Sequence, residues 1–262
     1  KIVGHIRFGI MPKTRKWPQV IGLMADTSAR PSDVQAVANA TLTAATKVFE
    51  RLINDQGLLY SYWTLIQLAL LSRDEKFIPA LKEKGIDISG VSDQFQLIAQ
   101  VSEYVRNRIR ESEKATVFSE MAQLSLSSIL TKRLSLETPN IFGATFEDTR
   151  LALKQLSTKD KFASLSKEFF AEFMQRSLNY FISTEISNHI GPSSRFRNIN
   201  DVSEFNDALS LYCLQSAKIV EEFSGGWYSK TEYEKGIGLE EVKGFIFVAL
   251  KKLRAEMATG GV

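Results

Sequence analysis

The sequence predicts an all-α fold, a multi-helix bundle of about seven to nine helices with a short extended N-terminal arm. Apolar residues recur at helical spacing almost without interruption from residue 32 to residue 257. The 262 residues include only 15 glycines and 6 prolines, too few for the turns of a sandwich or barrel of short strands. Strand-like alternation is confined to residues 1–12, and one such segment cannot form a sheet by itself.

The first half of the predicted bundle begins with the clearest amphipathic pattern in the chain. Apolar residues follow helical spacing over 34–53, and Ser32 with Gln35 three residues later is typical of a helix N-terminus. Four more helices are predicted before residue 138, at 58–71, 74–84, 92–112 and 114–136.

A break at Pro139 and Gly143 is the best candidate for a domain boundary. Four helices are predicted beyond it, and the phenylalanine-rich second one is apolar over so wide an arc that we expect it to be central. These helices lie at 146–156, 160–189, 202–223 and 239–257. We therefore expect a basic arm (1–29), a helical subdomain (30–138) and a second helical subdomain (144–258), with one continuous domain over both as the alternative.

Composition narrows the class of protein. The single cysteine, Cys213, forms no internal disulfide and fits a reducing compartment, so we expect a cytoplasmic protein. The longest uncharged run, 56–72, is too short and too polar to span a membrane, so no membrane association is expected. With His5 and His189 as the only histidines, a zinc site of Cys and His ligands cannot be assembled. No cofactor or metal is predicted.

The sequence does not decide whether the chain is an enzyme, but the motifs that are missing argue against enzymatic activity. No phosphate-binding P-loop, G-x-G-x-x-G or G-x-S-x-G motif occurs. Glu185 and His189 share a helix face and could form a general-base pair, but a histidine in the last helical turn more often caps carbonyls. We interpret Cys213 as a core residue rather than a nucleophile, because no base is indicated near it.

The first 25 residues carry a local excess of positive charge. They hold five basic residues and no acid, whereas the remaining 28 basic and 30 acidic residues nearly balance. Such an arm can attract phosphate or an acidic partner, although a merely solvated end is the more common case. The candidate residues in it are Arg7, Lys13, Arg15 and Lys16.

Three further segments combine aromatic and basic residues. The first is a polar loop at 191–198, the second a glycine-led loop at 225–230, and the third one flank of the last helix. Guanidinium groups beside rings suit phosphate, stacked bases or a protein hot spot. The alternatives are an inward-facing phenylalanine in the first loop, packing of the last helix by the second, and a solvated rim for the third. The candidate binding residues are Arg195, Phe196, Arg197, Trp227, Tyr228, Lys243, Phe247, Lys251 and Arg254.

We therefore expect a non-catalytic helical subunit or adaptor of an intracellular multiprotein complex, acting through protein–protein contacts. The alternative is a nucleic-acid-associated accessory protein that uses the basic arm and the arginine–aromatic loop. A net charge of +3 makes tight nucleic-acid binding by this chain alone unfavourable. A second alternative is an enzyme with a dispersed site of carboxylates and arginines.

Overall fold

The computed structural model describes residues 14–112, 114–137 and 145–259. Within these ranges the chain forms twelve α-helices, one short 3-10 helix and no strand, which confirms the all-α prediction but exceeds the expected seven to nine helices. The elements are α1 (Trp17–Ala25), α2 (Gln35–Ala44), α3 (Thr46–Arg51), η1 (Leu52–Asn54), α4 (Gln56–Leu71), α5 (Phe77–Glu83), α6 (Gln94–Glu111), α7 (Val117–Glu137), α8 (Phe146–Leu156), α9 (Lys159–Asn188), α10 (Ile199–Ser216), α11 (Lys218–Lys235) and α12 (Leu239–Thr259).

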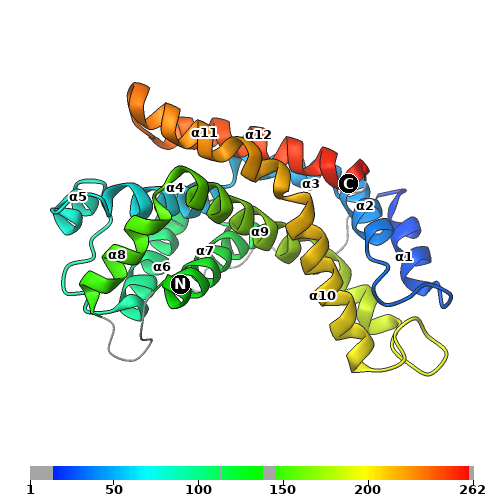
Figure 1. Cartoon of the computed structure of the whole chain (residues 1–262). Coiled ribbons are helices and arrows are strands. Elements are labelled where there is room, and N and C mark those ends of the chain that lie inside the picture. The colour runs from blue at the N-terminus through cyan, green and yellow to red at the C-terminus, as the bar shows by residue number, and fades with distance from the viewer. Residues whose placement is uncertain (1–13, 113, 138–144, 260–262) are drawn as a thin grey trace.

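The long helix α9 runs through the middle of the molecule and packs against α7, α10 and α11 (Figure 1). Its central place follows from its sequence, because buried apolar residues cover a wide arc of its circumference, for example Leu165, Phe170 and Leu178. In Figure 1, α4 to α8 gather at one end and α1, α2 and α10 at the other, while α11 and α12 lie side by side along one edge.

The extra helices have three sources. The predicted arm contains a helix, α1, whose Trp17, Val20 and Met24 follow helical spacing and are buried, with Pro18 in its first turn. The predicted basic arm, 1–29, therefore contains a helix that was not expected, and the segment predicted to be extended, 1–12, lies outside the described residues.

The other two sources are bends without a helix-breaking residue. The predicted helix 34–53 is divided into α2 and α3 by a turn at Ala45, and η1 follows α3 directly at Leu52. The predicted helix 202–223 is divided at Ala217, where α10 ends and α11 begins. The residue at each bend is an alanine, which favours helix. The sequence therefore gives no local signal for either bend.

Gly225 and Gly226, expected to end a helix, lie inside α11. A Cβ atom on Gly225 would stand 2.7 Å from the main-chain oxygen of Lys159, whereas one on Gly226 would meet nothing within 4 Å. The first glycine therefore allows α11 to approach the start of α9 closely.

Another close approach joins α4 to α7. The carboxylate of Asp55 accepts hydrogen bonds from the amide of Leu58 (2.9 Å) and the hydroxyls of Thr116 (2.6 Å) and Ser119 (2.8 Å). Asp55 thereby caps α4 and ties it to the start of α7. Burial raises the pKa of this carboxyl, and the hydrogen bonds oppose the rise.

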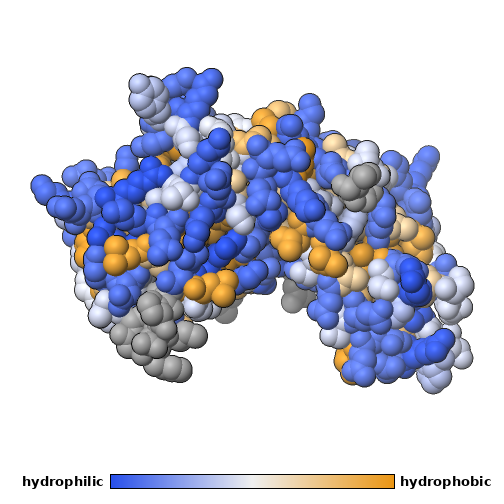
Figure 2. All heavy atoms as spheres, in the orientation of Figure 1, coloured by the Kyte–Doolittle hydropathy of each residue, from blue (hydrophilic) through white to orange (hydrophobic). Residues whose placement is uncertain are grey.

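One apolar core extends through the molecule, from Trp17 in α1 to Met257 in α12. It draws on residues of both predicted subdomains, and the division at 138–144 stays a prediction. Figure 2 shows apolar groups scattered among hydrophilic ones on one face, which is hollowed between the two ends of the molecule. Within the described residues, no helix has both the length and the apolar character required to cross a bilayer.

Candidate protein-binding surface on the last helix

Two of the four candidate residues of the basic arm lie in the described part of the chain. Arg15 and Lys16 are exposed just before α1, whereas Arg7 and Lys13 lie outside the described residues. Binding by this arm stays a prediction.

The loop at 191–198 turns its arginine–aromatic pair inward, so the expectation that both side chains face a partner is wrong. The side chain of Phe196 is fully buried and packs edge-on against Phe205, with ring centroids 5.4 Å apart. Arg195 is only 4% exposed. Arg197, the second arginine, remains exposed.

Arg195 has a structural task. Its guanidinium donates hydrogen bonds to the main-chain oxygens of Leu23 (2.6 Å), Arg30 (3.1 Å) and Asp33 (2.8 Å). Leu23 lies in the last turn of α1, where carbonyls have no partner within the helix. Burial lowers the pKa of Arg195 and the nearby acids oppose this, but an arginine stays charged. Arg195 therefore ties α1 and the α1–α2 connection to the rest of the fold.

Trp227 and Tyr228 belong to α11 rather than to a loop. Tyr228 is buried and stacks on Phe162 of α9, with centroids 3.8 Å apart, so it packs against α9 rather than against the last helix. Trp227 is half-buried against Phe245 of α12, with centroids 4.4 Å apart. Trp227 thus lines the surface between α11 and α12.

The four residues predicted on the cationic flank of the last helix lie on one side of α12. Lys243, Phe247 and Lys251 are exposed on α12, and Arg254 is half-buried. Phe247, Lys251 and Arg254 line one wall of a groove of about 640 Å³, and Lys243 lies one turn before Phe247 on the same side of the helix. We call this the α12 groove.

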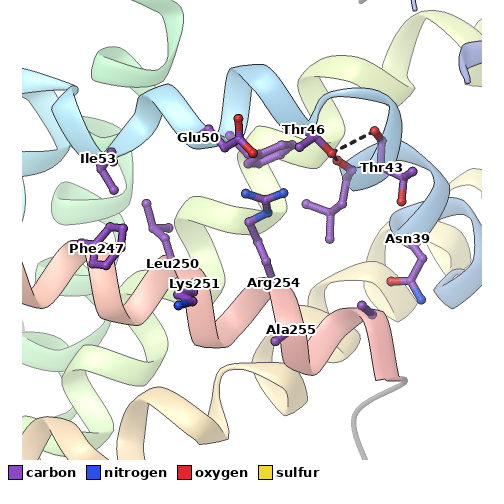
Figure 3. A pocket seen from close by; sticks show the side chains of 13 residues that line it. Asn39, Thr43, Thr46, Glu50, Ile53, Phe247, Leu250, Lys251, Arg254 and Ala255 are labelled. Atoms are coloured by element: carbon purple, nitrogen blue, oxygen red, sulfur yellow. Dashed lines mark hydrogen bonds between the residues drawn. The ribbon is translucent and has the colours of Figure 1, made fainter. Parts of the chain in front are cut away.

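The opposite wall of the α12 groove comes from α2, α3 and η1. Figure 3 shows Asn39 near the Ala255 end of α12 and Ile53 near Phe247, so the two walls run antiparallel. The hydroxyl of Thr46 donates to the main-chain oxygen of Thr43 (2.9 Å) and is thus partly occupied within its own wall. The lining residues are Asn39, Leu42, Thr43, Thr46, Phe49, Glu50, Ile53, Phe247, Leu250, Lys251, Arg254, Ala255 and Ala258.

This opposite wall was not predicted. The only sequence signal for it is a stripe of Thr43, Thr46, Glu50 and Ile53 at helical spacing. In the predicted helix 34–53 that stripe is indistinguishable from any boundary between a buried and a solvated face.

The electrostatics of the groove are asymmetric. The stretch from 242 to 255 holds four cations and no acid: Lys243, Lys251, Lys252 and Arg254. Within the described part of the chain, none of these four forms an ion pair, although Lys252 lies over the Phe223 ring at 5.3 Å. Glu50 is the one acid among the described residues that line the groove. The charged side chains of α12 that line the groove are thus positive, and Glu256, the acid that follows this stretch, does not line it.

A second groove of about 510 Å³ lies on the other side of α12, against α11. Trp227, Phe245 and the exposed Val248 line it, and the ion pair between Lys235 and Glu241 (2.9 Å) stands at its edge. The exposed side of α12 is therefore bordered by apolar depressions on both flanks.

The residues considered for catalysis are placed as follows. Cys213 is buried and its thiol pKa is raised by burial, which confirms its assignment to the core. The buried carboxylate of Glu185 accepts a hydrogen bond from the indole of Trp17 at 3.3 Å, and His189 follows α9 as its C-cap. Across the described ranges, no cluster of three or more His, Cys, Asp or Glu residues could hold a metal ion.

Comparison with protein-family models, with curated proteins and with solved structures finds no match for this chain.

Proposed function

We propose that this chain is a non-catalytic helical subunit or adaptor of an intracellular complex, and that it contacts another protein through the exposed side of α12. The observation that carries the proposal is the adjacent pair Phe247 and Val248, 49% and 39% exposed, between two apolar-lined grooves. Exposed apolar area is unfavourable in water by about 25 cal/mol per Å², and contiguous patches of it mark contact sites.

Isolated exposed hydrophobic residues are normal and carry no such meaning. Leu136 and Tyr233 are more exposed than Phe247, yet neither lines a groove beside α12. Leu211, 54% exposed, does line a groove of about 730 Å³, but no lysine or arginine lines that groove. The side of α12 differs because an aromatic residue, a groove with an apolar floor and unpaired cations occur together. Aromatic residues and arginine are the types enriched at binding hot spots.

The proposal is tested by photo-crosslinking in cells of the source organism. Phe247 and the control Phe95 on α6 are both exposed phenylalanines on helices, at 49% and 52%. Each is replaced in turn by p-benzoylphenylalanine, which preserves the ring. We expect a discrete crosslinked protein from position 247 and not from position 95. Identical products from both positions, or none from position 247, would contradict the proposal.

The nucleic-acid alternative is favoured by one observation, the four cations between residues 242 and 255. Phosphate contacts by these side chains would give binding that weakens steeply with salt. Titration of duplex DNA and of RNA at two salt concentrations, with Lys251→Glu as the comparison variant, tests this alternative. Arg195 belongs to the fold and is not available for such contacts.

A further inference from the structure

The α12 groove also indicates what kind of partner segment it fits. We propose that it binds an amphipathic helix whose polar side is acidic. This inference rests on the proposed function and concerns the same surface.

The length of the groove suits a short helix. Its α12 wall runs from Phe247 to Ala258, which at 1.5 Å per residue is about 17 Å, or three helical turns. The α2–α3 wall lies antiparallel beside it, so the groove is an elongated trough between two helices (Figure 3). A partner segment of about three turns would fill it.

The backbone of the walls favours a helical ligand over an extended one. Both walls are helices, whose main-chain groups are paired internally, and no strand edge borders the groove within the described residues. An extended peptide would gain no ladder of main-chain hydrogen bonds there and would leave its own groups unpaired. A helix satisfies its own backbone and needs only an apolar stripe at i, i+4 and i+7 for the groove floor.

The floor of the groove is apolar and would contact the apolar stripe of the partner helix. Leu42, Phe49 and Leu250 form its buried part, and Ile53 and Phe247 its more exposed part. Phe247 is the most exposed large apolar side chain of the groove, so we assign it the role of anchor for the apolar stripe of the partner.

The charges on the groove walls indicate which charge the polar side of the partner helix should carry. Lys251 and Arg254 line the α12 wall without an ion-pair partner among the described residues, and Lys243 extends that wall. Carboxylates of the partner that face α12 would therefore be stabilised. Glu50 stands in the opposite wall, so the side of the partner that faces α3 should lack acids. This split pattern also disfavours a continuous phosphate backbone.

The test begins with a phage-displayed library of random 14-residue peptides. Peptides are selected on the full chain and counter-selected on Phe247→Ala. We expect enriched sequences to carry net negative charge and apolar residues spaced three and four apart. Enriched sequences that are neutral or basic or that lack this spacing would overturn the inference, and so would the failure of any sequence to survive the counter-selection.

The best peptide is then synthesised and titrated by fluorescence anisotropy. Lys251→Glu with Arg254→Glu should weaken binding at least tenfold, and raising the salt concentration should weaken binding to the unaltered chain. Phe95→Ala, the matched control, should leave the affinity unchanged. Equal binding by the charge-reversed variant, or displacement of the peptide by duplex DNA at equal concentration, would overturn the inference. Milder Lys251→Gln replaces the double variant if circular dichroism shows unfolding.

The outcomes separate this inference from the proposed function. A discrete crosslink from position 247 together with basic or non-helical selected peptides would leave the protein contact standing and refute the acidic helix. Acidic helical peptides without any crosslink in cells would support the groove chemistry and refute its proposed use.

Discussion

The adjacent glycines of α11 offer a direct test of how this helix packs. Gly225 is buried, and a Cβ atom there would stand 2.7 Å from the main-chain oxygen of Lys159 and 3.3 Å from the side chain of Ala163. The closest of these atoms belongs to the first residue of α9 and cannot yield without moving that helix. Gly226 is exposed with nothing within 4 Å of such an atom.

Alanine at either position gains about 0.5–1 kcal/mol, because glycine loses more conformational freedom inside a helix. Neither glycine has a positive φ that alanine would find strained. Gly225→Ala additionally forces extra volume into a packed contact, which destabilises by about 1–3 kcal/mol. The shared helix term cancels between the two variants, so Gly226→Ala should be more stable than Gly225→Ala by about 1–3 kcal/mol.

The assay is thermal and urea unfolding followed by far-ultraviolet circular dichroism. For a chain of this size the difference corresponds to roughly 2 to 12 °C in Tm, with Gly226→Ala above the unaltered chain. Equal stabilisation by both alanines would refute the close approach of α11 to α9. Destabilisation by both would instead support the loop with glycine-specific conformation that the sequence alone predicts.

Three further variants test other parts of the fold. Arg195→Ala should destabilise by about 3 kcal/mol in urea unfolding, because a buried side chain and its three hydrogen bonds to main-chain oxygens are lost. Arg197→Ala should stay within about 0.5 kcal/mol, and similar effects of the two variants would contradict the assignment. The pKa of Asp55 is raised in the folded state, so the folded chain binds a proton there more readily than the unfolded chain. The unaltered chain should therefore gain stability relative to Asp55→Asn as the pH falls from about 7 to about 4. The opposite trend would refute this. Cys213→Ala should cost about 1 kcal/mol, and the native thiol should not react with Ellman's reagent before unfolding.

The sequence predicted those helices whose ends are fixed by residues next to them in the chain. The helix expected at 146–156 occurs with those bounds, and Thr145 caps it through reciprocal hydrogen bonds with Asp148. Gly85 directly follows the helix predicted at 74–84, and it has φ +83° just beyond the end of α5. Hydrophobic spacing also placed Phe247 on the correct flank of α12, because that flank is fixed by the helical period.

Features that depend on distant partners could not be predicted. The orientation of Arg195 is decided by carbonyls more than 160 residues earlier in the chain. Gly225 can terminate a helix or allow two helices to approach, and only the position of Lys159 decides between these roles. The second wall of the α12 groove likewise depends on how α3 meets α12, a tertiary arrangement without a local signature.

The same helix serves the core on one side and the proposed interface on the other, so stability and binding should be separable within α12. Phe245 is buried, with its ring centroid 4.4 Å from that of Trp227 and 5.2 Å from that of Tyr62, and Phe245→Ala should destabilise by about 3–5 kcal/mol. Phe247, two residues on, is half exposed, and Phe247→Ala should change stability by less than about 1 kcal/mol while abolishing partner contact. Urea unfolding and peptide titration of both variants measure the two effects. If Phe247→Ala unfolds the chain as readily as Phe245→Ala, its ring belongs to the core, and the case for α12 as a contact surface fails.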